Sequence, residues 1–169
     1  QEQAFTKLLA LLPHLSDDLN GGLWRHYLGR SMYYRGELEQ ALRQYSLEWQ
    51  LHQAKPSVKL RLQRSIVRVL LDMGHFHHAQ QLAQQALDEQ QRNNSAYLYK
   101  SLGHLGEIHL RQGNYAKAIE YFSEAWQKQA STAKEGQTAI SLGHAHLLNG
   151  DLIQAKDWYQ QAERVNKKQ

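Results

Sequence analysis

The sequence contains no cysteine and only two prolines among its 169 residues. Without cysteine the chain can form no disulfide, no thiolate ligand for zinc and no thiol nucleophile. Proline removes a backbone hydrogen-bond donor and clashes with the preceding helical turn, so its scarcity leaves most of the chain able to form helices. The absences therefore exclude thiol chemistry and favour helical structure.

Long apolar runs and blocks of like charge are also missing. No stretch reaches about 18 apolar residues, so the sequence predicts no membrane span. Leu, Ala, Gln, Glu, Lys and Arg dominate while Val and Ile are sparse, and this composition predicts an all-α fold. The formal net charge is only +4. Dedicated nucleic-acid binders usually carry denser basic clusters, so binding to nucleic acid is disfavoured.

Four glycines repeat along the chain at separations of 38, 39 and 37 residues: Gly36, Gly74, Gly113 and Gly150. The position five residues after each glycine is always alanine: Ala41, Ala79, Ala118 and Ala155. An aromatic residue stands nine residues after three of these glycines: Tyr45, Phe122 and Tyr159. Glycine stands seven residues before the same three: Gly29, Gly106 and Gly143. The chain therefore contains four related units.

The physical roles of these positions predict a helix pair in each unit. A glycine between two helical patterns often adopts a positive φ at the end of the first helix. Asn114 and Asp151 follow two of the glycines and could cap the next helix. The small residues let the two helices approach closely, and the aromatic residue fills the gap beyond them. Each unit is therefore expected to be an antiparallel helix pair joined by a tight turn.

The apolar periodicity places helices in nine ranges. Eight belong to the repeats: 22–35, 37–54, 57–73, 76–91, 95–112, 115–130, 132–149 and 151–166. A further amphipathic helix is expected over residues 2–12, where it would be the second helix of a partial preceding repeat. The chain is interpreted as a fragment of a longer protein.

This pattern resembles the tetratricopeptide repeat (TPR) family, most clearly in "LGHLGEIHLRQGNYAKAIEYFSEAWQ" and "ISLGHAHLLNGDLIQAKDWYQQA". The units are near 38 residues, whereas the usual repeat has about 34. Such lengthened units are similar to those of TPR-containing signalling and transcriptional regulators of bacterial type. The resemblance implies one right-handed superhelical solenoid over residues 1–169. Its repeats would span about 22–56, 57–94, 95–131 and 132–166.

The resemblance also implies that the first helix of each unit lines a concave face. The residues expected to bind a ligand there are Arg30, Tyr33, Tyr34, Arg61, Arg64, Arg68, Lys100, His104, Arg111 and His144. Among all inward positions, six basic residues against Asp72 and Glu107 leave a net charge of +4. Arginine binds carboxylates bidentately, so this face suits an acidic, extended partner. The alternative is an ordinary solvated face, where Glu107 and Arg111 merely stabilise their own helix.

The predicted function is a protein–protein interaction scaffold that binds an acidic extended peptide or protein segment. The alternative is a sensor or regulatory segment of a larger signalling or transcriptional regulator, which binds a small effector or self-associates. No catalytic grouping appears, so the chain is not expected to be an enzyme, and no cofactor is predicted. The histidines of "HFHH" lie on a turn without further ligands, so no metal site is predicted.

The expected partner is a protein or peptide. A homo-oligomer could also form through the end repeats, since the helix faces at both ends look partly apolar. The expected location is cytoplasmic, with the periplasm left open.

Overall fold

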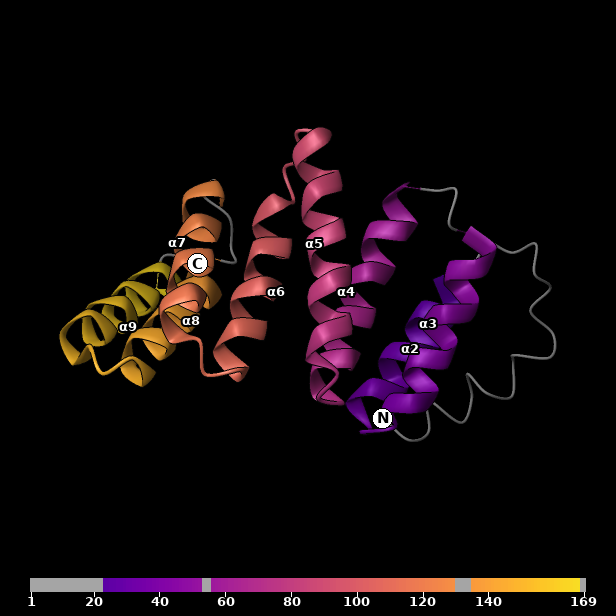
Figure 1. Ribbon diagram of the computed structural model, residues 1–169, viewed down its shortest axis with the longest axis horizontal. Coiled ribbons are helices and arrows are strands. Elements are labelled where there is room, and N and C mark those ends of the chain that lie inside the picture. The colour runs from indigo at the N-terminus through magenta and orange to yellow at the C-terminus, as the bar shows by residue number, and fades with distance from the viewer. Residues whose placement is uncertain (1–22, 53–55, 130–134, 168–169) are drawn as a thin grey trace. The chain divides into compact units, whose positions relative to one another are not determined.

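The structure is a computed structural model that describes residues 23–52, 56–129 and 135–167 (Figure 1). Within these ranges the chain forms eight α-helices and no strand. The all-α class predicted from composition is therefore confirmed. The helix expected over residues 2–12 lies outside the described residues.

The chain divides into two compact units, residues 1–75 and residues 76–169, which are described separately. The helices of unit 1 are α2 (Leu23–Tyr34), α3 (Leu38–His52) and α4 (Pro56–Asp72). The helices of unit 2 are α5 (Phe76–Arg92), α6 (Leu98–Arg111), α7 (Tyr115–Lys128), α8 (Glu135–Leu148) and α9 (Leu152–Asn166). Each predicted repeat helix coincides with one of these, with ends that agree within three residues.

The four repeat glycines adopt the conformation that their position predicts. Their φ angles are +81° at Gly36, +77° at Gly74, +78° at Gly113 and +86° at Gly150. Each lies at the end of the first helix of its pair, where two backbone hydrogen bonds close the last turn. After α6, for example, the N–H of Asn114 donates to the carbonyl oxygen of His109 at 2.9 Å. Glycine adopts this φ without strain, which explains its regular spacing.

The two predicted helix caps have different outcomes. Asp151 accepts a hydrogen bond from the backbone N–H of Gln154 at 3.2 Å, so its capping role is confirmed. Asn114 makes no such side-chain bond, and the prediction for it is wrong. The backbone N–H of Asn114 donates to the carbonyl oxygen of His109 at the end of α6, and the Asn114 side chain is exposed to solvent. The turn between α6 and α7, in the third pair, therefore forms without a side-chain cap.

The glycine seven residues before each turn and the aromatic residue nine after it are direct neighbours. A Cβ atom added at Gly29 would lie 2.6 Å from the ring of Tyr45. A Cβ atom added at Gly106 would lie 2.6 Å from the ring of Phe122. At Gly143 it meets the ring of Tyr159 at 2.7 Å. In these three pairs the aromatic ring occupies the space that a glycine leaves beside the helix backbone, as the predicted close approach requires.

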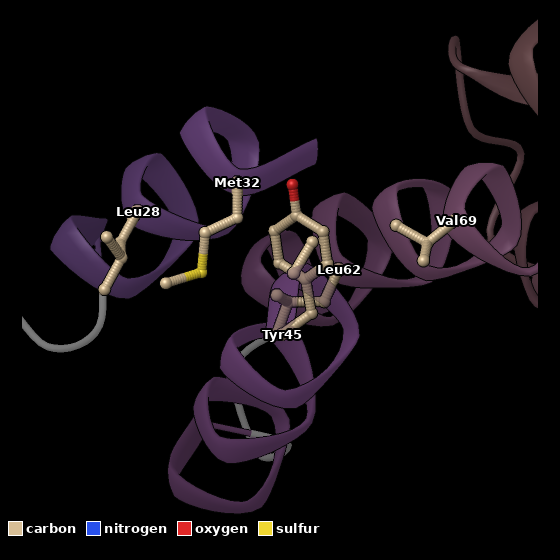
Figure 2. Packing of buried hydrophobic residues seen from close by; sticks show 6 residues of the cluster. Leu28, Met32, Tyr45, Leu62 and Val69 are labelled. Atoms are coloured by element: carbon tan, nitrogen blue, oxygen red, sulfur yellow. The ribbon is translucent and has the colours of Figure 1, made fainter. Parts of the chain in front are cut away.

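The core of unit 1 joins its three helices (Figure 2). Leu28 and Met32 of α2 face Tyr45 of α3, and Leu62 and Val69 of α4 complete the buried cluster. Tyr45 is the largest of the fully buried side chains. Because its ring contacts both neighbouring helices, it links the first helix pair to the first helix of the next repeat.

The core of unit 2 repeats this arrangement two repeats further along the chain, between α6, α7 and α8. Leu110, Ala118 and Phe122 pack against Leu142 and Ala145 of α8. Consecutive repeats in this unit are also joined by neutral hydrogen bonds. Gln90 Nε2 donates to Ser101 Oγ at 2.9 Å between α5 and α6. Thr138 Oγ1 donates to Gln129 Oε1 at 2.7 Å between α7 and α8.

None of the eight described helices combines the length and the apolar character that crossing a membrane requires.

Candidate functional site

The predicted inward residues of α2 and α4 meet each other in unit 1. The hydroxyl of Tyr33 on α2 donates a hydrogen bond to Asp72 Oδ2 on α4 at 2.6 Å. The guanidinium of Arg68 on α4 lies 5.9 Å from the centre of the Tyr33 ring. First helices of consecutive repeats therefore lie side by side through the positions that the repeat pattern marks as inward.

Arginine and tyrosine side chains alternate along this surface. The guanidinium of Arg30 lies 5.8 Å from the ring centre of Tyr34, which is 68% exposed. The rings of Tyr33 and Tyr34 meet edge to face at 5.4 Å. Within the described part of the chain, neither Arg30 nor Arg68 forms an ion pair. Their positive charge is therefore not neutralised by a carboxylate of the described residues.

The buried imidazole of His26 marks the point on which the arginines converge. Burial, together with the positive charges of Arg61, Arg30 and Arg64, lowers the pKa of His26 from 6.5 to about 4. Two of those arginines come from α4 and one from α2. His26 therefore stays neutral at ordinary pH, and the guanidinium groups provide the positive charge of this region.

Tyr45 lies beneath the same surface and joins it to the core. Its hydroxyl hydrogen-bonds with Ser65 of α4, and Arg30 and Arg68 are close enough to act on its charge. Burial nevertheless raises the pKa of Tyr45 to about 12, so the hydroxyl stays protonated. We define the α2–α4 surface as Arg30, Tyr33, Tyr34, Arg64 and Arg68, which lie over His26, Tyr45 and Ser65.

Arg61 differs from the other predicted arginines because a buried carboxylate binds it. Arg61 Nη2 lies 2.8 Å from Glu48 Oε1 of α3, and Glu48 is completely buried. Burial raises the pKa of Glu48, and the ion pair with Arg61 opposes that shift. The charge of Arg61 is therefore compensated inside the fold. The net charge of +4 predicted for the inward face is too high by one positive charge, because Glu48 was not counted.

The remaining predicted site residues lie in unit 2. Lys100, on α6, has its ammonium 4.5 Å from the ring centre of Tyr97. Arg111 Nε lies 2.7 Å from Glu107 Oε1, so the ion pair within one helix that the alternative interpretation required is present. His104 is half-buried on α6, and His144 is exposed on α8. That these four residues form one binding face with the α2–α4 surface stays a prediction.

Sequence reasoning placed His26 and Ser65 at inward positions without listing them as binding residues, and it missed Glu48 as part of this site. Glu48 carried a visible signal, because the other three repeats have alanine at its position: Ala86, Ala125 and Ala162. A carboxylate at a position reserved for small buried residues predicts a basic partner. Arg61 is that partner, one helix further along the chain.

Metal binding has no candidate among the described residues, since no three histidine, aspartate or glutamate side chains converge there as ligands would. The described residues offer instead a surface of guanidinium and phenol groups. Such groups recognise carboxylates and apolar side chains rather than cations.

Comparison with known proteins confirms the resemblance to the tetratricopeptide repeat family. The family model of the tetratricopeptide repeat matches residues 97–168. No curated protein matches the chain significantly. Among solved structures, BtubC from P. vanneervenii is similar with a TM-score of 0.73 and 18% identity, covering 98% of this chain and 72% of that one.

Two Rap proteins are similar in fold as well. One is the Rap conjugation gene regulator of plasmid pLS20, solved with the Phr* peptide: the TM-score is 0.80 at 20% identity, covering 99% of this chain and 47% of that one. The other was solved with competence and sporulation factor: the TM-score is 0.83 at 16% identity, covering 96% of this chain and 48% of that one. The chain thus spans about half the length of these two proteins.

Proposed function

We propose that this chain, whose helix pairs have the fold of tetratricopeptide repeat proteins, is an interaction scaffold that binds an extended acidic segment of another protein. The observation that carries the proposal is that Arg30 and Arg64, whose charges act on the buried, neutral His26, lie on the facing helices α2 and α4. Arg68 adds a further positive charge beside Tyr33. The binding region is the α2–α4 surface.

The chemistry of the surface suits carboxylates on an extended backbone. Each exposed guanidinium can donate two parallel hydrogen bonds to one carboxylate, which fixes its orientation. The exposed ring of Tyr34 provides an apolar contact next to Arg30, so a hydrophobic residue beside an acidic one would fit. Because both helices are already packed against the core, little ordering entropy opposes binding on the protein side.

The test is binding of fluorescein-labelled acidic peptides, each compared with a peptide in which Gln and Asn replace Glu and Asp. We expect the acidic members to bind more tightly and the difference to shrink as salt is raised. The double substitution Arg30→Glu with Arg68→Glu should weaken that binding by at least about 10-fold, because it places two negative charges on the surface.

A matched control reverses the charge of two exposed basic residues that lie on the second helices of their pairs, in the double variant Arg43→Glu with Lys117→Glu. The total charge change is the same, so a loss confined to the first double variant assigns binding to the α2–α4 surface. Equal losses in both variants, or no preference for acidic over neutral peptides, would overturn the acidic partner. The helix-pair scaffold itself would be unaffected by that result.

A second candidate is a sensor or regulatory segment of a larger regulator. It is supported by the similarity to two Rap proteins, both solved with a bound peptide or factor. In that case a short free peptide should bind this chain as tightly as the same sequence within a folded protein does. A scaffold for protein segments should instead bind the protein more tightly, because it contacts more of the protein.

A further inference from the structure

The outer side of α8 and α9 in unit 2 carries a hollow of about 370 Å³ that the described residues leave open. Its lining consists of Leu147, Leu152, Ala155, Lys156, Tyr159, Gln160 and Glu163. We call this surface the α9 seat. Leu152 is 65% exposed and Tyr159 is 38% exposed, so two large apolar side chains lie together at the surface around this hollow.

The positions that line the α9 seat recur in the earlier repeats, at the same distances from the turn glycine. In unit 2 their counterparts pack into the core formed with α8: Leu110, Tyr115, Ala118, Ile119, Phe122 and Trp126. In unit 1 their counterparts pack into the core formed with α4: Tyr33, Leu38, Ala41, Leu42, Tyr45 and Trp49. In both units a helix covers these positions. The α9 seat therefore has the geometry of a helix-binding surface whose helix is absent from the described chain.

Two charged residues distinguish the α9 seat from its covered counterparts. Lys156 stands where the first and third repeats have Leu42 and Ile119. Glu163 stands where they have two tryptophans, at 49 and 126. An apolar helix like α8 would bury both charges without partners, which is strongly unfavourable. The occupant must therefore supply a negative charge opposite Lys156 and a positive charge opposite Glu163.

We propose that the occupant is the α9 seat of a second copy of this chain, bound in an antiparallel contact with two-fold symmetry. Lys156 and Glu163 are seven residues apart and so lie on the same side of α9. Tyr159 and Gln160 lie midway between them. A two-fold axis at that midpoint places Lys156 of one copy beside Glu163 of the second copy, and the reverse pair forms by symmetry.

The charges of α9 are available for such a contact. Within the described residues Lys156 forms no ion pair. Glu163 Oε1 lies 2.6 Å from Lys167 Nζ, but both side chains are mostly in solvent. An exposed pair of this kind exchanges partners at little cost. The seat is smaller than a standard protein interface, so the dimer is expected to form and dissociate rapidly. The proposal does not depend on the peptide-binding function.

The test is sedimentation equilibrium of the 169-residue chain over about 5 to 500 µM, a range suited to weak dimers. We expect a monomer–dimer equilibrium. Lys156→Glu should make the chain monomeric because each dimer would then bring four carboxylates together, and Glu163→Lys should do so with four ammonium groups. The two single variants mixed in equal amounts should form heterodimers, and the double variant Lys156→Glu with Glu163→Lys should dimerise again.

Two control variants make the same charge changes on α9 at residues that do not line the α9 seat. Arg164→Glu is the control for Lys156→Glu, and Asp157→Lys is the control for Glu163→Lys. Both controls should dimerise like the original chain. A monomer at every concentration would overturn the proposal. So would a dimer that single reversals leave unchanged, or single variants that fail to pair when mixed. Recovery in the double variant guards against loss of folding, since it contains both substitutions.

Discussion

The two units of the chain join consecutive repeats by different chemistry. In unit 1 the contact between α3 and α4 contains a buried ion pair, Glu48 with Arg61. In unit 2 the equivalent contacts contain neutral hydrogen bonds, such as that between Gln90 and Ser101. The same helix-pair geometry therefore tolerates either a charged or an uncharged junction, in which buried polar side chains of the two helices bind each other. The charged junction lies next to the arginine-rich surface of unit 1.

The largest effect should come from removing one partner of the ion pair. Arg61→Gln removes the ion-pair partner of the fully buried Glu48 and leaves only the weaker influence of Arg25, so we expect the free energy of unfolding to fall by about 3 to 5 kcal/mol. Adding Glu48→Ala should recover most of this loss, because it removes the unpaired buried carboxylate. Residues 48 and 61 would then be alanine and glutamine, like Ala125 and Gln137 at the same repeat positions of the α7–α8 junction. Urea unfolding followed by circular dichroism measures both variants.

The control for this comparison is Lys100→Gln, at the position of unit 2 that corresponds to Arg61. It should change the free energy of unfolding by no more than about 0.5 kcal/mol. A similar loss for Lys100→Gln and Arg61→Gln would contradict the distinction between a charged and a neutral junction.

A smaller effect is expected from acidification, and it tests the buried histidine in each unit. The pKa of His26 is lowered to about 4, so between pH 6.5 and 4 the unfolded chain binds a proton that the folded chain does not. Stability should therefore fall as the pH falls through this range, by up to about 3 kcal/mol from His26. Burial and the charge of Lys117 lower the pKa of His109 in unit 2, so it acts in the same direction.

Urea unfolding at pH 7 and pH 4.5 measures this dependence, with His26→Gln and His109→Gln as the comparison variants. Each substitution should reduce the loss of stability on acidification. The raised pKa of Glu48 acts in the opposite sense, so the difference between each variant and the original chain is the informative quantity. An unchanged pH dependence in both variants would mean that neither histidine is buried in its neutral form.

The smallest effects concern the two helical glycines of α6. A Cβ at Gly106 would meet the ring of Phe122, whereas at Gly103 it would meet nothing within 4 Å. Gly106→Ala should therefore lower the free energy of unfolding by about 1 to 3 kcal/mol through overpacking. Gly103→Ala should raise it by about 0.5 to 1 kcal/mol, because alanine has the higher helix propensity. Thermal unfolding distinguishes the two, and equal shifts would contradict the close approach of α6 and α7.

The local structure of the repeats was predictable because it depends on residues close in sequence. The period of Gly36, Gly74, Gly113 and Gly150 located the turns, and their positive φ angles follow from the lack of a side chain. The pairing of Gly106 with Phe122 was expected from size alone. The cap assigned to Asn114 was wrong, because whether a side chain reaches a helix end depends on its exact placement, which spacing does not determine.

The candidate site was predictable only in part. The family resemblance placed Tyr33, Arg68 and Asp72 at inward positions, and in the structure these three side chains meet between α2 and α4. It could not show that Arg61 turns toward Glu48, since the choice between solvent and a buried carboxylate is made by packing between α3 and α4.

The sequence alone therefore determined the helices, their turns and the small-against-aromatic packing within each pair, because these follow from periodicity and steric size over a few residues. Only the tertiary structure decided which arginines remain unneutralised and that the α9 seat is left open. Both outcomes depend on which side chains from different helices meet, and Coulomb and desolvation energies depend on distances in space rather than on separation along the chain.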